Sequence, residues 1–202
     1  MPEGRLVTAA DAPRAAAEIG FPVALKLGRP ALAHKTEAGA VTLNLRSEQA
    51  VAEAVAAMSA SLARYQPGLV PELFLVERQV AGVVAELIVG LHRDPQFGLV
   101  MVVGMGGTLV ELVEDATSLL LPTDRESVAR ALQRLKVMKL LKGYRGKPAG
   151  DIEAAIDAIM AIARFADAHR DRLVELDVNP LMVLPEGQGA VAVDALIVMA
   201  GE

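Results

Sequence analysis

The alternation of hydrophobic and polar positions is clearest near the end of the chain, where two apolar runs surround a polar turn. The turn is Pro185-Glu186-Gly187-Gln188, and Pro and Gly between two such runs predict a β-hairpin. With these residues as the turn, Leu184 pairs with Gly189. Counting back along both strands then places Asn179 opposite Asp194.

This hairpin carries a candidate metal site. Glu175, Asp177 and Asn179 occupy alternate positions, so a strand would place their side chains on one face. Opposed residues on one face lie about 5 Å apart at Cβ, and Mg²⁺ accepts one or two protein oxygen ligands beside water and phosphate. The alternative is a solvated strand face next to a turn. Asp194 argues against that alternative because its strand is otherwise apolar, so we expect Asn179 and Asp194 to bind Mg²⁺.

Periodicity elsewhere in the chain predicts helices alternating with strands. Helices are expected at residues 9–19, 47–64, 124–138 and 151–168. Strands are expected at residues 21–27, 40–45, 74–80, 83–91, 99–103 and 108–113.

Three of these strands carry isolated charges. Lys26 interrupts a buried strand, either as a lysine that extends from a sheet edge or as a cation at an anion-binding cleft. Glu77 is followed directly by Arg78 near the expected boundary between two lobes, and sequence does not decide which of them faces inward. Glu86 is costly to bury unless it is paired or hydrogen-bonded.

Two loops add candidates. Residues 28–39 form a polar loop between strands, containing His34, that could act as a flap over phosphates, although an isolated histidine there fits an ordinary surface residue. Gly104, Gly106 and Gly107 could bring backbone N–H groups close to an anion. A tight hairpin needs glycine too, and neither a Walker A loop nor a dinucleotide fingerprint is present.

Composition narrows the functional classes. The 202 residues can bury a sizeable core, and 53% of them are hydrophobic but only 3% aromatic. No apolar run approaches the length of about 18 residues that spans a bilayer, and a net charge of −5 gives no reason to expect nucleic acid. With no cysteine and no visible signal peptide, we expect a cytoplasmic protein without disulfides or thiol chemistry.

Several blocks together resemble the ATP-grasp portion of the NDP-forming (ADP-forming) acyl-CoA synthetases, a family related to the β subunit of succinyl-CoA synthetase. They are FPVALKL, LAHKTEAGAV, ELIVGLHRDPQFG, GMGGTLVE, GYRGKP, ELDVNPL and VAVDA, which together extend over nearly the whole chain. The resemblance implies an α+β ATP-grasp fold with a nucleotide between two lobes. It predicts a single ATP-grasp domain, with an N-terminal lobe at residues 1–78 and a C-terminal lobe at residues 79–202.

The resemblance also implies roles for the candidates. Lys26 would contact ATP phosphate, and Glu77 would lie near adenine and ribose, with Glu86 as a second acidic residue of the nucleotide site. Asn179 and Asp194 match magnesium ligands, which agrees with the hairpin geometry. His34 resembles a histidine that accepts a phosphoryl group. Gly104, Gly106 and Gly107 would face that group or the phosphohistidine of a partner domain.

The family's CoA-binding domains are absent from these residues. The resemblance therefore predicts a chain that binds ATP or ADP with Mg²⁺ but needs succinyl-CoA-ligase-like partner domains, in the same polypeptide or another subunit, to make acyl-CoA. An alternative is a regulatory ATP-grasp module, because related segments are fused to protein acetyltransferases. Neither nucleic acid nor a membrane is an expected partner.

Overall fold

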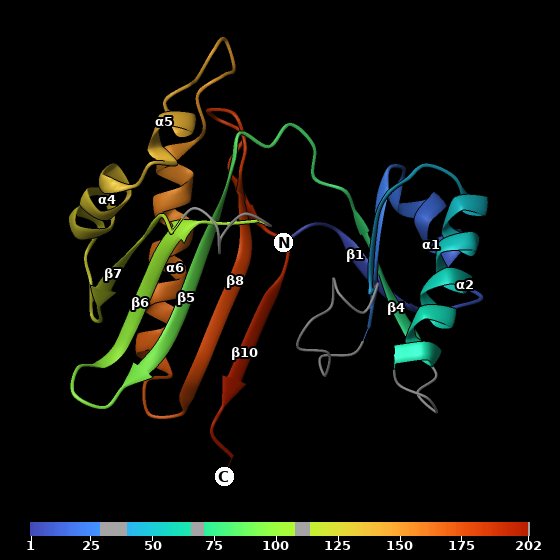
Figure 1. Cartoon of the computed structure of the whole chain (residues 1–202), viewed down its shortest axis with the longest axis horizontal. Helices are drawn as coiled ribbons and strands as arrows, with labels where there is room; N and C mark the ends of the chain where they lie inside the picture. The colour runs from blue at the N-terminus through green and yellow to red at the C-terminus, as the bar shows by residue number, and fades with distance from the viewer. Residues whose placement is uncertain (29–39, 66–70, 108–113, 202) are drawn as a thin grey trace. The chain divides into compact units, whose positions relative to one another are not determined.

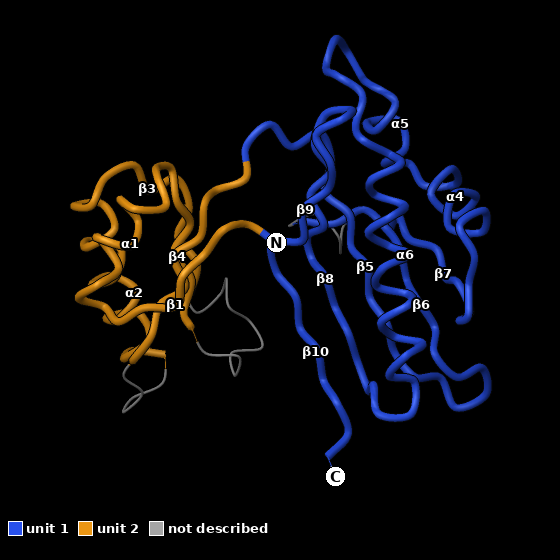
Figure 2. The backbone as a smooth tube through the Cα atoms, turned by 180° about the vertical axis from the view of Figure 1, so that it is seen from behind, with its two compact units in different colours: residues 1, 81–202 blue, residues 2–80 orange. Residues whose placement is uncertain are grey.

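The structure, a computed structural model, describes residues 1–28, 40–65, 71–107 and 114–201. These residues form two compact units, residues 2–80 and residues 81–202 together with Met1 (Figures 1 and 2). We refer to them as the 2–80 unit and the 81–202 unit. Mixed helices and antiparallel sheets confirm the predicted α+β class.

The 2–80 unit is a four-stranded sheet with strand order β1-β4-β2-β3. Two helices pack on one of its faces and share a core with alternate strand residues, among them Leu25, Phe74 and Val76. None of the helices described in this unit packs on the opposite face. The elements are β1 (Gly4–Thr8), α1 (Ala12–Ile19), β2 (Val23–Leu27), β3 (Val41–Leu45), α2 (Glu48–Tyr65) and β4 (Leu73–Arg78).

The 81–202 unit contains a larger sheet with order β10-β8-β5-β6-β7, and β9 also pairs with β8. Its described helices lie on one face, and no helix in the described ranges covers the other face, which is called the helix-free face below (Figure 1). The strands are β5 (Ala85–Asp94), β6 (Gly98–Met105), β7 (Ala116–Leu120), β8 (Leu173–Val183), β9 (Ala190–Ala192) and β10 (Ala195–Met199). The helices are α4 (Arg125–Arg134), α5 (Met138–Leu141) and α6 (Ile152–Ala168).

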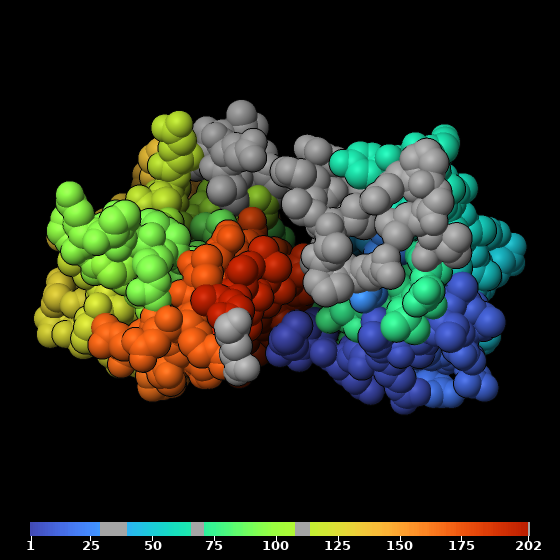
Figure 3. Space-filling model, turned by 90° about the horizontal axis from the view of Figure 1, so that it is seen from below, coloured from blue at the N-terminus to red at the C-terminus, as the bar shows by residue number. Residues whose placement is uncertain are grey.

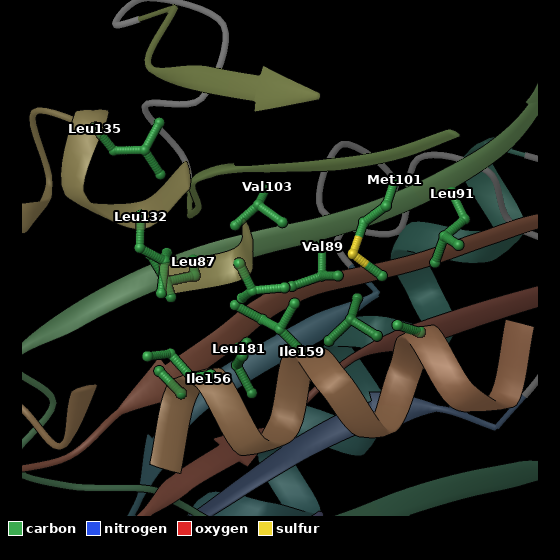
Figure 4. Close-up of a cluster of buried hydrophobic side chains, with 14 of the residues drawn as sticks. Leu87, Val89, Leu91, Met101, Val103, Leu132, Leu135, Ile156, Ile159 and Leu181 are labelled. Atoms are coloured by element: carbon green, nitrogen blue, oxygen red, sulfur yellow. The ribbon is translucent and has the colours of Figure 1, made fainter. Parts of the chain in front are cut away.

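The core of the 81–202 unit lies between its sheet and helices. Alternate residues of the central strands, such as Leu87, Val89 and Met101, meet Ile156 and Ile159 of α6 (Figure 4). All five are buried. Because strand side chains alternate between faces, the residues between these core positions lie on the helix-free face.

Three expectations need correction. The strands β1 and β7 were not predicted, and the helix predicted from Asp124 to residue 138 is divided into α4 and α5. The division has a cause: both carboxylate oxygens of Asp115 accept backbone bonds, from Lys136 N at 2.7 Å and Val137 N at 2.8 Å. These bonds hold residues 136–137, which form the link between α4 and α5, so the chain does not continue as one helix there.

Candidate functional site

The 2–80 unit holds a buried ion pair. In the antiparallel pairing of β2 and β4, Ala24 lies opposite Glu77 and Lys26 lies opposite Leu75, so Lys26 and Glu77 are diagonal neighbours on one face. The Lys26 Nζ and Glu77 Oε2 atoms are 2.6 Å apart. The side chains are only 13% and 5% exposed, so both charges are largely shielded from water.

This geometry decides two open questions from the sequence. β2 lies between β4 and β3, so the interpretation of Lys26 as a lysine at a sheet edge is wrong. Glu77 faces the helix-free side, whereas Arg78 reaches Glu3 at 3.1 Å and the carbonyl of Ile19. Of these two neighbouring residues, Glu77 is therefore the one whose carboxylate is buried beside Lys26.

In the 81–202 unit the predicted hairpin register is confirmed. Leu184 N donates to Gly189 O at 3.0 Å, and Asn179 N donates to Asp194 O at 3.2 Å. The second strand is interrupted at residues 193–194, between β9 and β10, so Asp194 lies at a break in the strand. Asn179 and Asp194 thus lie opposite each other, as the turn predicts.

A bulge in β8 sets the position of Asn179. The register of β5 with β8 shifts between Leu87 and Val89, at the level of residues 179–180. A bulge bends the strand and redirects a side chain. The Asn179 Oδ1 atom accepts a hydrogen bond from Gly107 N at 3.0 Å, which connects the hairpin to the end of the glycine-rich segment.

The three candidate glycines have different surroundings. Gly104 lies within β6 opposite Ile88, not in a loop. Gly106 N donates to Glu86 O at 2.8 Å, and a Cβ at Gly106 would collide with the Leu87 backbone. Gly107 has a φ of +82°, and a Cβ there would collide with the Glu86 carboxylate. The backbone therefore needs glycine at 106 and 107 for close approach to β5.

Glu86, Gly107, Asn179 and Asp194 together are called the hairpin site below. Glu86 is half-buried, faces the helix-free side, and makes no ion pair or hydrogen bond with another described residue through its carboxylate. Burial, followed by the negative charges of Glu175 and Asp194, raises the pKa of the neighbouring Asp177. The helix-free face near the hairpin is thus rich in carboxylates that repel one another, and a cation there would relieve the repulsion.

Two aspartates that were not predicted as part of the site support this region. Besides dividing α4 from α5, Asp115 accepts Met105 N at its backbone oxygen, at 2.8 Å. Asp151 accepts Ala154 N at the start of α6 and Gly189 N at the hairpin turn, both at 3.0 Å. Sequence identifies Asp151 as a helix cap, but its second bond depends on a contact 38 residues away in the chain.

Three further expectations concern the histidine, the metal ligands and the membrane. His34 lies outside the described residues. Within the described ranges, no group of three or more acidic or histidine side chains could hold a metal ion. The hairpin site offers fewer ligands, namely the Asn179 amide oxygen and the carboxylates of Asp194 and Glu86. This still fits Mg²⁺, which commonly takes only one or two protein ligands. No helix in the described part of the chain is long and apolar enough to cross a membrane.

Residues 1–199 of the chain match the ATP-grasp domain family. The chain is 34% identical over 205 residues to the β subunit of ADP-forming acetate–CoA ligase II from Pyrococcus furiosus, covering all of this chain and 85% of that subunit. It is 32% identical to the ADP-forming 4-hydroxybutyrate–CoA ligase of Nitrosopumilus maritimus, but spans only 27% of that longer protein.

A solved structure agrees with this similarity. The chain superimposes with a TM-score of 0.79 and 34% identity on dinucleotide-forming acetyl-coenzyme A synthetase 1 of Candidatus Korarchaeum cryptofilum, covering 98% of this chain and 84% of that one. That structure contains coenzyme A and Mg-AMPPCP, and its phosphohistidine segment points towards the nucleotide-binding site.

Proposed function

The chain belongs to the ATP-grasp family, in the group found in ADP-forming acetate–CoA ligases, and on that basis we propose that it is the nucleotide-binding part of an ADP-forming acyl-CoA synthetase. The observation that carries the proposal is the hairpin site. There, Asn179 Oδ1 accepts from Gly107 N, Gly107 lies against the Glu86 carboxylate, and the Asp194 backbone pairs with Asn179, on a sheet whose other face is core.

Mg·ATP is the proposed ligand. Asn179 and Asp194 would hold the metal, with Glu86 as a further acidic group beside Gly107. Bound Mg²⁺ would supply charge neutralisation to the phosphate oxygens. The Lys26 ammonium would contact phosphate, and Glu77 would keep that ammonium directed to one face of its sheet. Neutralisation and positioning are the main demands of phosphoryl transfer.

The proposed reaction passes the γ-phosphoryl group to a histidine. The bond from the γ-phosphorus to the bridging oxygen breaks, a bond to an imidazole nitrogen forms, and ADP leaves. A neutral imidazole is a competent nucleophile near pH 7. The phosphohistidine then passes its phosphoryl group to a carboxylate, which frees the imidazole, and the CoA thiol displaces inorganic phosphate from the acyl phosphate to form acyl-CoA. Gly104, Gly106 and Gly107 would lie beside the phosphoryl group in this scheme.

The CoA steps need partner domains. The chain spans about a quarter of the length of the larger CoA ligase it matches. We therefore propose that it binds nucleotide by itself and forms acyl-CoA only with CoA-binding domains, supplied in the same polypeptide or by another subunit. A regulatory role in a protein acetyltransferase has no support among the relatives named above.

Calorimetric titration tests nucleotide binding. Wild-type chain should bind ATP and ADP more tightly with Mg²⁺ than without it, and Lys26→Ala should weaken both. Arg5→Ala is a matched control, because Arg5 is an exposed cation of the same unit. A folded wild-type chain that gives no heat at about millimolar ATP, equivalent to a binding free energy weaker than about −4 kcal/mol, would contradict the proposal.

His34 is proposed as a phosphoryl acceptor that works only with the partner domain. With that partner, labelled ATP should leave an acid-labile phosphoryl group on this chain, and His34→Ala should abolish it. His92→Ala is the control, because His92 is an exposed histidine on β5. Label on the partner alone, with turnover unchanged in His34→Ala, would remove His34 from the reaction.

A further inference from the structure

The strand β10 is an open, uncharged edge of the larger sheet. It pairs with β8 on one side and has no strand on the other in the described part of the chain. Leu196, Ile197 and Val198 are 43%, 48% and 36% exposed. Figure 3 shows the C-terminal residues, coloured red, at the molecular surface. Folded proteins usually protect such edges with charge, proline or a cover, so an apolar edge indicates an interface.

The hydrogen bonds between β10 and β8 show which backbone N–H and C=O groups of β10 point to the open edge. Asp194 O accepts Asn179 N at 3.2 Å, and Ala200 N donates to Arg172 O at 2.7 Å, so even-numbered residues direct backbone groups towards β8. In antiparallel strands, alternate residues direct both N–H and C=O to the same side. Ala195, Ile197 and Met199 therefore present their N–H and C=O groups at the open edge.

This arrangement is symmetric about Ile197, and we infer that a second copy of the chain pairs with β10 in antiparallel register centred on that residue. Ile197 then lies opposite its own copy, and Ala195 lies opposite Met199 of the other copy. Each facing pair exchanges two N–H···O bonds. Leu196 meets Val198 of the other copy on the helix-free face, so apolar side chains match on both faces. Such a two-fold contact closes on itself.

Charge favours β10 over the opposite edge of the sheet. Residues 195–199 carry no charge, and Asp177 would lie three strand spacings from Glu175 of the other copy, about 14 Å. This distance exceeds the Debye length of about 8–10 Å. At the other edge, Arg130 and Arg134 line a cavity of about 140 Å³ beside β7. Self-pairing there would bring like charges together.

A single strand pair buries less than the roughly 800 Å² per partner of a stable complex, so we expect dimerisation at about 100 µM and above. Sedimentation equilibrium should show a mass rising with concentration from 21.2 kDa towards twice that value. Ile197→Lys and Ile197→Glu should each remain monomeric. Their equimolar mixture should dimerise, because opposite charges then face each other at position 197. Leu120→Lys, on the β7 edge, should dimerise like wild type.

A cross-link gives a second, independent measurement. The chain contains no cysteine, and Cα atoms of a hydrogen-bonded antiparallel pair lie about 5.5 Å apart, within disulfide range. Ile197→Cys should form a disulfide dimer under mild oxidation, and Val174→Cys, equally exposed but on β8, should not. Monomeric wild type up to about 1 mM, or equal cross-linking of both cysteine variants, would overturn the inference. Nucleotide binding is measured separately, so neither result depends on it.

Discussion

Lys26 and Glu77 show how much a single residue's surroundings decide about a substitution. A lysine in open solvent could be replaced at little cost, but here each charge is buried against the other. Removing Lys26 would leave the buried Glu77 carboxylate without this cation, and the loss of one partner of a buried pair typically costs about 3–5 kcal/mol. Replacing both partners by apolar groups of similar size is often neutral.

A double-mutant cycle tests this description of the pair. Lys26→Met should lower the free energy of unfolding by about 3 kcal/mol because it leaves the buried Glu77 carboxylate without this cation, and adding Glu77→Leu should recover most of the loss. Urea unfolding followed by circular dichroism measures all four proteins. If the two single losses simply add in the double variant, the residues do not act as a pair.

The sheet face on which each of these side chains lies was only partly predictable from sequence. Alternation in FPVALKL places Lys26 on the face opposite Leu25, and the structure agrees. Sequence cannot choose between Glu77 and Arg78, because the choice depends on the register of β4 against β2, whose residues are about 50 positions apart in the chain. His34 stays a prediction.

At the scale of elements, the hairpin site depends on the β8–β9 hairpin and on Asp151, which caps α6 and also bonds to the hairpin turn. The turn chemistry sets the register locally, which is why Asn179 and Asp194 could be placed opposite each other from sequence. By contrast, β1 is short and largely exposed, and its position comes from pairing with β4 far along the chain, so its local pattern carried little signal. The same holds for Asp115, whose partners lie more than 20 residues away.

The metal prediction is tested at the hairpin. Asp194→Ala should weaken binding of Mg·ATP by about tenfold or more, as expected for a lost ligand, and change metal-free ATP binding little. The hairpin should survive because its apolar positions are untouched. Calorimetry with and without Mg²⁺ gives both affinities, and Glu186→Ala, in the exposed turn, is the control. Equal losses in both conditions would indicate structural damage instead of a lost ligand.

The Asp151 carboxylate makes the stability of the fold at the hairpin turn depend on pH. Backbone N–H groups, first that of Ala154 and then that of Gly189, hold the pKa of Asp151 below its ordinary value. A depressed pKa stabilises the fold above the unfolded value of about 3.9, and that contribution is lost as the pH falls towards the lower folded pKa. Asp151→Asn should therefore lower the urea midpoint at pH 7, and its difference from wild type should shrink below about pH 4.

The control for this change is Asp167→Asn, at an exposed position near the end of α6. Asparagine at 151 can still cap the helix, so the loss reports mainly the charged contact with Gly189. A difference from wild type that stays constant from pH 7 to about pH 3 would contradict the role given to the carboxylate.

At the scale of the whole molecule, the two units have separate cores. Phe74 is fully buried in the 2–80 unit, and Ile159 is fully buried in the 81–202 unit. Neither core contains residues of the other unit. Each unit therefore has the means to unfold by its own transition.

Core truncation tests this independence. Phe74→Ala should destabilise the 2–80 unit by about 3–5 kcal/mol, and Ile159→Ala should destabilise the 81–202 unit by about 2–5 kcal/mol. Hydrogen exchange followed by mass spectrometry should show faster exchange only in peptides of the altered unit. Faster exchange throughout the chain in both variants would show that the units unfold together.

The contact between Lys26 and Glu77 has one more consequence, for the ions that surround any protein in a cell. An anion that approaches Lys26 must compete with a carboxylate that already lies 2.6 Å away. Chloride or acetate carries a single charge and offers little in return, whereas a triphosphate presents several charged oxygens at once. Because a buried pair is screened by salt far less than an exposed one, this competition persists at physiological ionic strength. The pair would thus act as a filter that disfavours small monovalent anions and leaves the lysine available to polyanions.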